Sequence, residues 1–537
     1  MKTNLEELFP NLRLQFLRIF IITLLSECIY AQGNIRIANP HLSVSQNIEV
    51  SSESNIIETM ELFSESPESN SLNSQNDEVI SEATYLTLDT AKLKIILDTK
   101  PGVVKLRLKR NDGKKVEIEL LRYEILSERF TSGIVESMLY KQMDYQPGLY
   151  YRGVVVGEEN TIVAMSFFEE EVQGVIADAQ GNWVLGPLKN SSHYIYYNDK
   201  NLKPKFQFEC GISDEGNLNT EKVTATKSMC PINVFWVGDF DFFGVSNYDV
   251  TTAFNNITAI FNNVAALYQQ EGIVVYLSEI YVHTSPDFYD EWDSWNAFHS
   301  FGYQIHQAQN FDEDLAMLLA VNLNGNSQSY GVIDALCSNF VPQQSGKYAY
   351  SRIETYAYAV PTYSWTIYVV THEMGHNLGS RHTHWCGWPG GAIDNCSNVE
   401  PDAWGNFCNP GPFPSDGGTI MSYCALMLGS INFNNGFGYY PHQEITTDVN
   451  SASTCLCLGI EESNALLFDV WPNPSNDYIE VQYYGGDFEL RIFNYLGQVV
   501  MDCKNQNKVD VAFLSKGVYL VVLFNNNRIG IKKFIKE

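Results

Sequence analysis

The chain has 537 residues, a formal net charge of −29 at pH 7 and a hydrophobic content of 45%. This length exceeds one ordinary domain and predicts about three or four, and the apolar content is enough for a large buried core. The excess of carboxylates argues against a nucleic-acid partner, because the sequence offers no basic patch to neutralise phosphates.

The N-terminal residues are typical of a secretory signal, with basic residues up to Arg18, an apolar run over 19–25 and a cleavage point after Ala31. We place this signal at residues 1–31 and expect a secreted protein. The competing interpretation is a lipid anchor on Cys28, which the acidic residue just before it disfavours. No later apolar run is long enough to cross a bilayer, so we expect no transmembrane segment in the mature protein.

The next two segments differ in composition. Residues 32–83 are rich in Ser, Asn and Glu and poor in aromatic residues, which predicts a disordered acidic arm. Strand signals dominate residues 84–229, for instance the alternating run at 115–120 and the apolar run at 161–168. Turn residues at 180–182 separate two further strand-like runs. This second segment therefore predicts a β-rich domain.

Strands and helices alternate over residues 230–460, a pattern typical of an α/β (α+β) domain. The expected strands lie at 232–237, 273–282 and 314–320, and the expected helices at 251–269, 295–307 and 364–378. Residues 465–537 show only short strands and turns, which predict a small C-terminal β-sandwich.

The eleven residues from His372 to His382 read H-E-x-x-H-x-x-G-x-x-H. Residues four apart share one face of a helix, so His372 and His376 can bind a single ion. Glu373 lies one step round, close enough to reach a water on that ion. Gly379 can adopt a left-handed conformation and turn the chain so that His382 supplies a third nitrogen. Three neutral ligands leave one position of a tetrahedral zinc open, as a catalytic site requires.

This motif, together with Met421 and Tyr423 in the sequence Thr-Ile-Met-Ser-Tyr, resembles the metzincin clan of zinc endopeptidases, and within it the reprolysin (adamalysin-like) branch. The resemblance implies that Met421 forms a hydrophobic floor below the metal and that Glu373 is the general base and acid of peptide hydrolysis. Two features depart from the branch. Thr383 stands where reprolysins usually carry Asp, and Tyr423 is similar to a tyrosine of astacins and serralysins that supports the transition state. We expect His384 at the surface or just behind the ligands.

Eight cysteines lie between Cys230 and Cys457, enough for four disulfides in an exported protein, although the sequence does not give their pairing. Cys210 and Cys503 are left over. The run from Cys210 to Ile212 resembles the cysteine switch of metzincin propeptides, in which a thiolate fills the open zinc position. The alternative is a disulfide between Cys210 and Cys230.

A cysteine switch would make residues 84–229 a propeptide. Activation would then require a cut between about Asp214 and Met229, where the sequence is polar and contains Lys222 and Lys227.

The last segment carries four short motifs in a characteristic order. They are Val470-Trp471-Pro472-Asn473-Pro474-Ser475, the run from Leu490 to Gln498, Gly517-Val518-Tyr519-Leu520 and the final Lys532-Lys533-Phe534-Ile535-Lys536. Together they resemble the type IX secretion sorting domain of Bacteroidetes. The resemblance implies export by the type IX machinery and release from, or attachment to, the surface of a Gram-negative cell. The alternative is a β module that binds carbohydrate or protein.

The sequence as a whole predicts a multidomain, secreted zinc metalloendopeptidase that is made as a zymogen and acts on protein or peptide substrates. The predicted ligands are His372, His376 and His382, with Cys210 in the zymogen, and the predicted catalytic residues are Glu373 and Tyr423. The alternative is a surface adhesion or binding protein with a vestigial protease domain, which the intact motif disfavours. Calcium is a further candidate cofactor, but no ligand set for it stands out.

Overall fold

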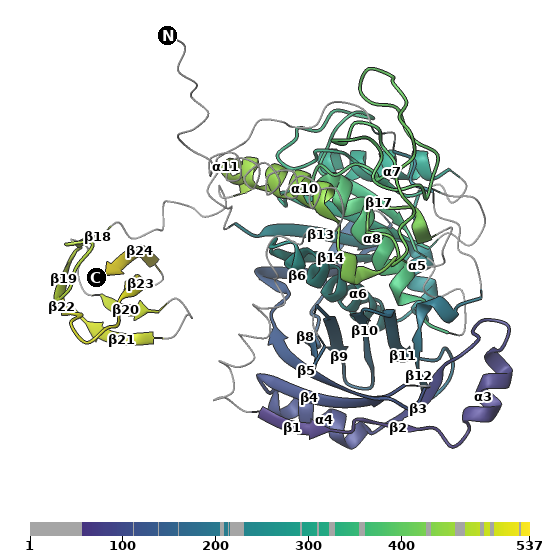
Figure 1. Cartoon of the computed structure of the whole chain (residues 1–537), viewed down its shortest axis with the longest axis horizontal. Helices are drawn as coiled ribbons and strands as arrows, with labels where there is room; N and C mark the ends of the chain where they lie inside the picture. Colours follow the sequence, from purple (N-terminus) through teal and green to yellow (C-terminus); the bar gives the residue numbers. More distant parts are fainter. Residues whose placement is uncertain are drawn as a thin grey trace, which may run out of the picture. The chain divides into compact units, whose positions relative to one another are not determined.

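The computed structural model describes residues 56–537 except 111, 138, 159, 204–208, 213, 215–229, 290–292, 309–310, 322–327, 354–359, 426–430, 457–467, 484–487, 495–498 and 526–527. The expected signal at 1–31 lies outside the described residues. The chain divides into two compact units, Met1–Ser453 and Thr454–Glu537 (Figure 1). Among the described helices, none is long and apolar enough to cross a membrane.

The first unit begins with a ten-stranded sheet of order β1-β4-β5-β8-β9-β10-β11-β12-β3-β2. Its strands are β1 (Ile56–Met60), β2 (Phe63–Glu65), β3 (Thr84–Leu88), β4 (Val103–Lys109), β5 (Lys115–Tyr123), β8 (Leu149–Val155), β9 (Ile162–Phe167), β10 (Val172–Asp178), β11 (Gly181–Pro187) and β12 (His193–Asn198). Helices α3 (Ser69–Asn76) and α4 (Thr90–Thr99) accompany it. Leu93 and Ile96 of α4 join the apolar cluster formed by alternate residues of these strands.

The prediction of a disordered arm at 32–83 is wrong from Ile56 onward, and residues 32–55 lie outside the described part. Strand β1 pairs in parallel with β4, and β2 pairs with β3. The polar average of this segment conceals a few apolar side chains that enter the core, among them the fully buried Leu62. These contacts and the sheet pairing order residues 56–83, although the composition of this segment alone predicts disorder.

The second sheet has seven strands in the order β16-β17-β15-β13-β14-β6-β7. They are β6 (Leu126–Glu136), β7 (Leu139–Gln142), β13 (Ile232–Gly238), β14 (Val275–His283), β15 (Leu315–Ala320), β16 (Tyr330–Gly331) and β17 (Tyr348–Arg352). The pairings from β17 to β6 are parallel, and the two outer strands, β16 and β7, are antiparallel to their neighbours. The predicted strands at 232–237, 273–282 and 314–320 are confirmed as β13, β14 and β15.

Strands β6 and β7 come from the chain between β5 and β8, yet they belong to the second sheet. Residues Thr131–Val135 of β6 pair with Glu279–His283 of β14. The two sheets of the first unit are therefore joined by a strand that precedes residue 229 in the chain, and a division of the sequence at that residue does not follow the sheets.

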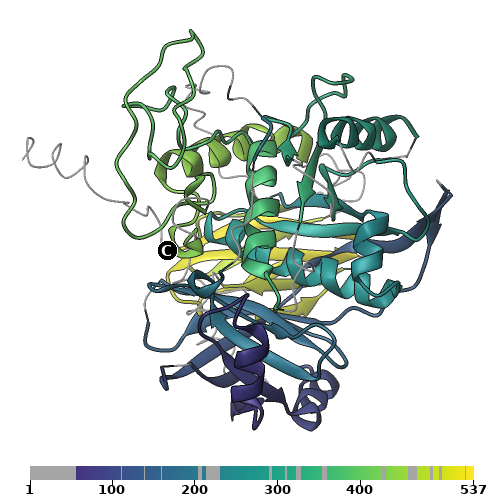
Figure 2. The same ribbon diagram turned by 90° about the vertical axis from the view of Figure 1, so that its right-hand side faces the viewer.

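Two long helices carry the rest of this unit. The predicted helix at 251–269 is confirmed as α6 (Val250–Gln270), capped by the Asp249 carboxylate, which accepts from the backbone N–H of Thr252. Helix α6 contacts β14 of one sheet and β9 of the other, and both views place it between the two sheets (Figures 1 and 2). This position explains why α6 is buried on almost every side.

The predicted helix at 364–378 is α8 (Tyr363–Asn377), and it is buried along its whole length. It contacts α6, the edge strand β16 and its neighbour β17. The predicted helix at 295–307 is α7 (Ser294–Tyr303), and the chain then continues as a π turn over Gln304–Ala308.

The second unit contains two antiparallel sheets. One is formed by β18 (Asp469–Trp471), β19 (Tyr478–Gln482) and β22 (Lys508–Asp510), and the other by β20 (Glu489–Phe493), β21 (Val499–Lys504), β23 (Gly517–Asn525) and β24 (Arg528–Lys536). Ile479 of the first sheet and Leu490, Val521 and Phe534 of the second are fully buried in one shared apolar cluster. The predicted strands at the end of the sequence thus have one common core.

Candidate metal centre

Helix α8 ends where the motif requires a turn. The backbone N–H of Gly379 donates to the His376 carbonyl at 2.9 Å, and Gly379 has a φ of +89°, in the left-handed region. A side chain there would be strained, and its Cβ would lie 2.9 Å from the Asp334 carboxylate. Gly379 therefore reverses the chain, as predicted, and brings His382 back toward the helix.

The structure brings together all the predicted ligands. One donor atom from each of Cys210, His372, His376 and His382 lies within 4.8 Å of the others, and all four residues are buried. The Nε2 atoms of His376 and His382 are 3.2 Å apart, and the Sγ of Cys210 is 3.4 Å from Nε2 of His376. Three imidazoles and a thiol thus converge on one point.

The hydrogen bonds made by the Nδ1 atoms of the three histidines determine that their Nε2 atoms face the centre of the cluster. Nδ1 of His372 lies 2.8 Å from the Ile420 carbonyl, and Nδ1 of His376 lies 2.8 Å from the Ser380 carbonyl. A carbonyl oxygen can only accept, so each Nδ1 carries the proton and each Nε2 presents its lone pair. Nδ1 of His382 lies 3.0 Å from the Asp214 carboxylate, with the same result.

This donor set fits zinc. Burial lowers the pKa of His372 and of His376 well below the usual value, and burial with the nearby His384 lowers the pKa of His382 to about 3. The rings are therefore neutral, which is the form that binds a metal. Lone pairs only 3.2 Å apart repel one another unless a cation lies between them. Neutral imidazoles and a soft thiolate are ligands that Zn²⁺ prefers.

Glu373 lies beside the cluster without joining it. Its Oε2 accepts from the Sγ of Cys210 at 3.6 Å, and its Oε1 has no hydrogen-bond partner among the described residues. Burial raises the pKa of Glu373 well above its usual range. A carboxyl group with a raised pKa next to an open metal position is suited to exchanging protons.

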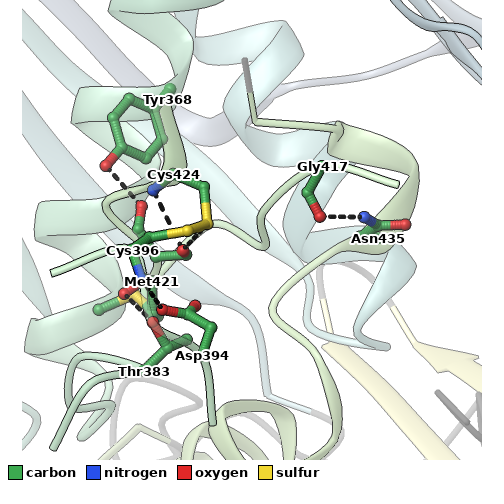
Figure 3. The surroundings of a disulfide bond; sticks show 9 residues. Tyr368, Thr383, Asp394, Cys396, Gly417, Met421, Cys424 and Asn435 are labelled. Carbon is green, nitrogen blue, oxygen red and sulfur yellow. Dashed lines mark hydrogen bonds between the residues drawn. A yellow bond between two sulfur atoms is a disulfide. The ribbon is translucent and has the colours of Figure 1, made fainter. Parts of the chain in front are cut away.

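Met421 lies directly against helix α8. Its side chain is fully buried, and a Cβ on Gly375 of α8 would approach its Sδ to 2.8 Å. The glycine therefore allows the helix to pass close over the methionine. The disulfide Cys396–Cys424 lies beside Met421 and fixes the chain just after it (Figure 3).

Tyr423 points its hydroxyl at the same cluster. The oxygen is 3.4 Å from Nε2 of His382 and accepts a hydrogen bond from the backbone N–H of Cys210 at 3.2 Å. The tyrosine thus contacts both a predicted ligand and the segment that carries the thiol.

The described cysteines fall into the two predicted groups, one in disulfides and one with free thiols. Cys386–Cys408 and Cys396–Cys424 are disulfides, and Cys230, Cys337 and Cys455 are also disulfide-bonded. Cys457 lies outside the described residues. Cys210 and Cys503 are free. The alternative disulfide between Cys210 and Cys230 is therefore wrong, because the thiol of Cys210 faces the histidines instead.

Two carboxylates near the cluster were not predicted. Asp214 contacts His382, and Glu400 lies 3.1 Å from Nε2 of His384. His384 itself is buried, with its ring stacked on that of His382, and so lies just behind a ligand. No spacing in the sequence marks Glu400, because it approaches through an irregular loop.

Comparison with known proteins identifies two segments. Residues 239–433 match the profile of metallo-peptidase family M12, and residues 469–537 match that of the secretion system C-terminal sorting domain. A search of curated proteins found no matching relative. Among solved structures, the chain is similar to one described as "Structure of a chaperone-substrate complex", with 11% identity and a TM-score of 0.26. That match covers 52% of this chain and 39% of the other. The chain therefore carries a peptidase domain of metallo-peptidase family M12 and ends in a secretion system C-terminal sorting domain.

Proposed function

We propose that the protein is a secreted zinc endopeptidase of the metzincin type, synthesised as a zymogen that hydrolyses extracellular proteins after activation. The observation that carries this proposal is the buried convergence of three histidine nitrogens and the Cys210 thiol, with Glu373 alongside. The match to family M12 and the sorting domain support a secreted metallopeptidase.

His372, His376 and His382 would hold the metal, and zinc bound there supplies a Lewis acid that polarises the scissile carbonyl. Glu373 takes a proton from the attacking water on a carboxylate oxygen and later delivers it to the leaving amine. Its Oε2 faces the Cys210 thiol at 3.6 Å, so the space that the thiol fills is the space in which the water would react. The raised pKa of Glu373 favours both proton transfers.

Cys210 would keep the enzyme inactive by filling that space. Its segment is held beside the edge strand β16, because the Gly211 N–H donates to the Ser329 carbonyl at 2.9 Å and the Ser329 N–H donates to the Glu209 carbonyl at 3.0 Å. These bonds occupy the backbone groups next to the metal centre. A cut between about 214 and 229 would free the segment, although 215–229 lie outside the described residues.

Tyr423 is proposed to donate a hydrogen bond from its hydroxyl group to the oxyanion that forms during hydrolysis. Replacing Tyr423 with phenylalanine is expected to lower kcat by about tenfold to a hundredfold and to leave KM nearly unchanged, because the interaction exists only in the transition state. Steady-state kinetics of the activated enzyme on a fluorogenic peptide would measure both constants. An increase in KM at constant kcat would contradict this role.

The overall proposal is tested by metal content and proteolysis together. The purified, activated protein is expected to contain one zinc ion per chain, to degrade an unstructured protein such as casein, and to lose this activity in a chelator and regain it with added zinc. The competing function, an adhesion protein with a vestigial protease domain, predicts no cleavage even with zinc bound. The four intact residues of the motif disfavour that alternative.

The C-terminal unit is proposed to be a β-sandwich that directs export through the type IX machinery of a Bacteroidetes-like bacterium, leaving the peptidase at or outside the cell surface. Its two sheets share one core, as a sandwich requires. Calcium has no assigned site, because each candidate metal group among the described residues includes His or Cys.

A further inference from the structure

His382 differs from the other two histidines in the origin of its outer partner. Ile420 and Ser380, which hold Nδ1 of His372 and His376, both lie within the segment that matches the peptidase family. Asp214, which holds Nδ1 of His382, lies outside that segment and only four residues after Cys210. One ligand therefore depends for its orientation on the inhibitory segment, defined by the described residues 209–212 and 214.

The contact between Asp214 and His382 is short and fully buried. Its Oδ2 accepts hydrogen bonds from both the backbone N–H and Nδ1 of His382, at 2.9 and 3.0 Å, and both side chains are fully buried. Hydrogen bonds between buried groups are stronger where water is excluded, and losing one partner leaves the other unsatisfied. This contact attaches the inhibitory segment to the site at a second point, on the side of His382 away from the thiol.

Glu400 is positioned to replace Asp214 as the hydrogen-bond partner of Nδ1 of His382. Its Oε2 accepts from the backbone N–H of Asp214 at 3.1 Å, and its Oε1 lies 3.8 Å from Nδ1 of His382. The carboxylate is partly exposed and is held by His384 at 3.1 Å. If Asp214 left, a small rotation of the Glu400 side chain would bring it into hydrogen-bond distance of His382.

We propose that Asp214 is a second latch of the inhibitory segment, and that Glu400 replaces it as the positioning residue of His382 when the segment leaves. The inference rests on the proposed zymogen and adds two residues to it. In the zymogen the segment is held by Cys210 and Asp214 together. In the active enzyme Glu400 keeps Nδ1 of His382 protonated and its Nε2 directed at the metal.

The latch is tested by the reactivity of Cys210 in the uncut, full-length protein. Asp214→Ala is expected to accelerate alkylation of Cys210 by at least about tenfold, because the loss of two buried hydrogen bonds lets the segment open more often. Asp214→Asn should give an intermediate rate. Mass spectrometry of the peptide that contains Cys210 measures the rate.

Two controls are built into the chain. Glu209→Ala removes a carboxylate from the same segment, but Glu209 is exposed and should leave the rate unchanged. Cys503, the free cysteine of the other unit, reports on general reactivity within each sample. Alkylation of Cys210 at the wild-type rate in Asp214→Ala would overturn the latch.

The replacement is tested by the rate at which zinc is lost to excess chelator, again in the full chain and in a Glu373→Ala background that prevents self-cleavage. Asp214→Ala and Glu400→Ala are each expected to stay within about threefold of the parent, because either carboxylate can hold His382. The double variant should release zinc at least about tenfold faster than the product of the two single effects predicts. A double-variant rate equal to the product of the single effects would overturn the exchange. Neither measurement needs peptide cleavage, so both remain decisive even if the proposed activity fails.

Discussion

Replacing Glu373 with alanine is expected to lower kcat by about a thousandfold or more, with zinc content unchanged. The Oε2 atom of Glu373 faces the Cys210 thiol at 3.6 Å, and among the described residues Glu373 is not part of the group of donor atoms that could hold the metal. Kinetics of the activated variant on a fluorogenic peptide, with metal analysis of the same sample, would measure both quantities.

Glu373→Gln is the matched control for this prediction, because it keeps the shape and removes only the proton-accepting carboxylate. Thermal unfolding should show that neither variant is less stable by more than a small amount. Glu373 is buried, and its Oε1 has no hydrogen-bond partner among the described residues, so the fold gains little from its charge. Wild-type turnover by either variant would end the proposed mechanism.

Replacing Cys210 with alanine is expected to give an uncut precursor that cleaves peptides at least about tenfold faster than the uncut wild type. The thiol is tethered beside the histidines, and a tethered ligand acts at an effective concentration on the order of millimolar. Activity of the precursor, checked for intact length on a gel before and after the assay, is the measurement. Activation should remain incomplete, because the backbone bonds of Gly211 and the Asp214 contact persist.

The same substitution at the other free cysteine, Cys503→Ala, provides the control, because that residue lies in the second unit. It should leave the precursor inactive. If Cys210→Ala left the uncut precursor as inactive as the wild type, the thiol would have no part in latency.

Much of the metal centre could be predicted because its information is local. The spacing of His372, His376 and His382 follows from helix geometry and one left-handed glycine, so a short stretch of sequence suffices. Cys210 could be found because the short run from Cys210 to Ile212 resembles a cysteine switch, and its position outside the group of eight cysteines agreed with that role.

The parts that escaped prediction depend on contacts between distant segments. Asp214 and Glu400 are ordinary acidic residues in irregular chain, and only the folded structure brings them to His382. The order of residues 56–83 was missed because an average over composition hides single buried residues such as Leu62. Strand β6 has the pattern of any strand, and nothing in that pattern says which sheet it will join.

The position of β6 has a consequence for what activation would produce. A cut after Asp214 breaks one peptide bond, but it leaves the backbone bonds between β6 and β14 in place. It also leaves the bonds of Arg152, whose guanidinium donates to Asn262 and Gln269 of α6. The cut protein would then be a stable two-chain particle, with its former N-terminal part retained as a subunit of the working enzyme.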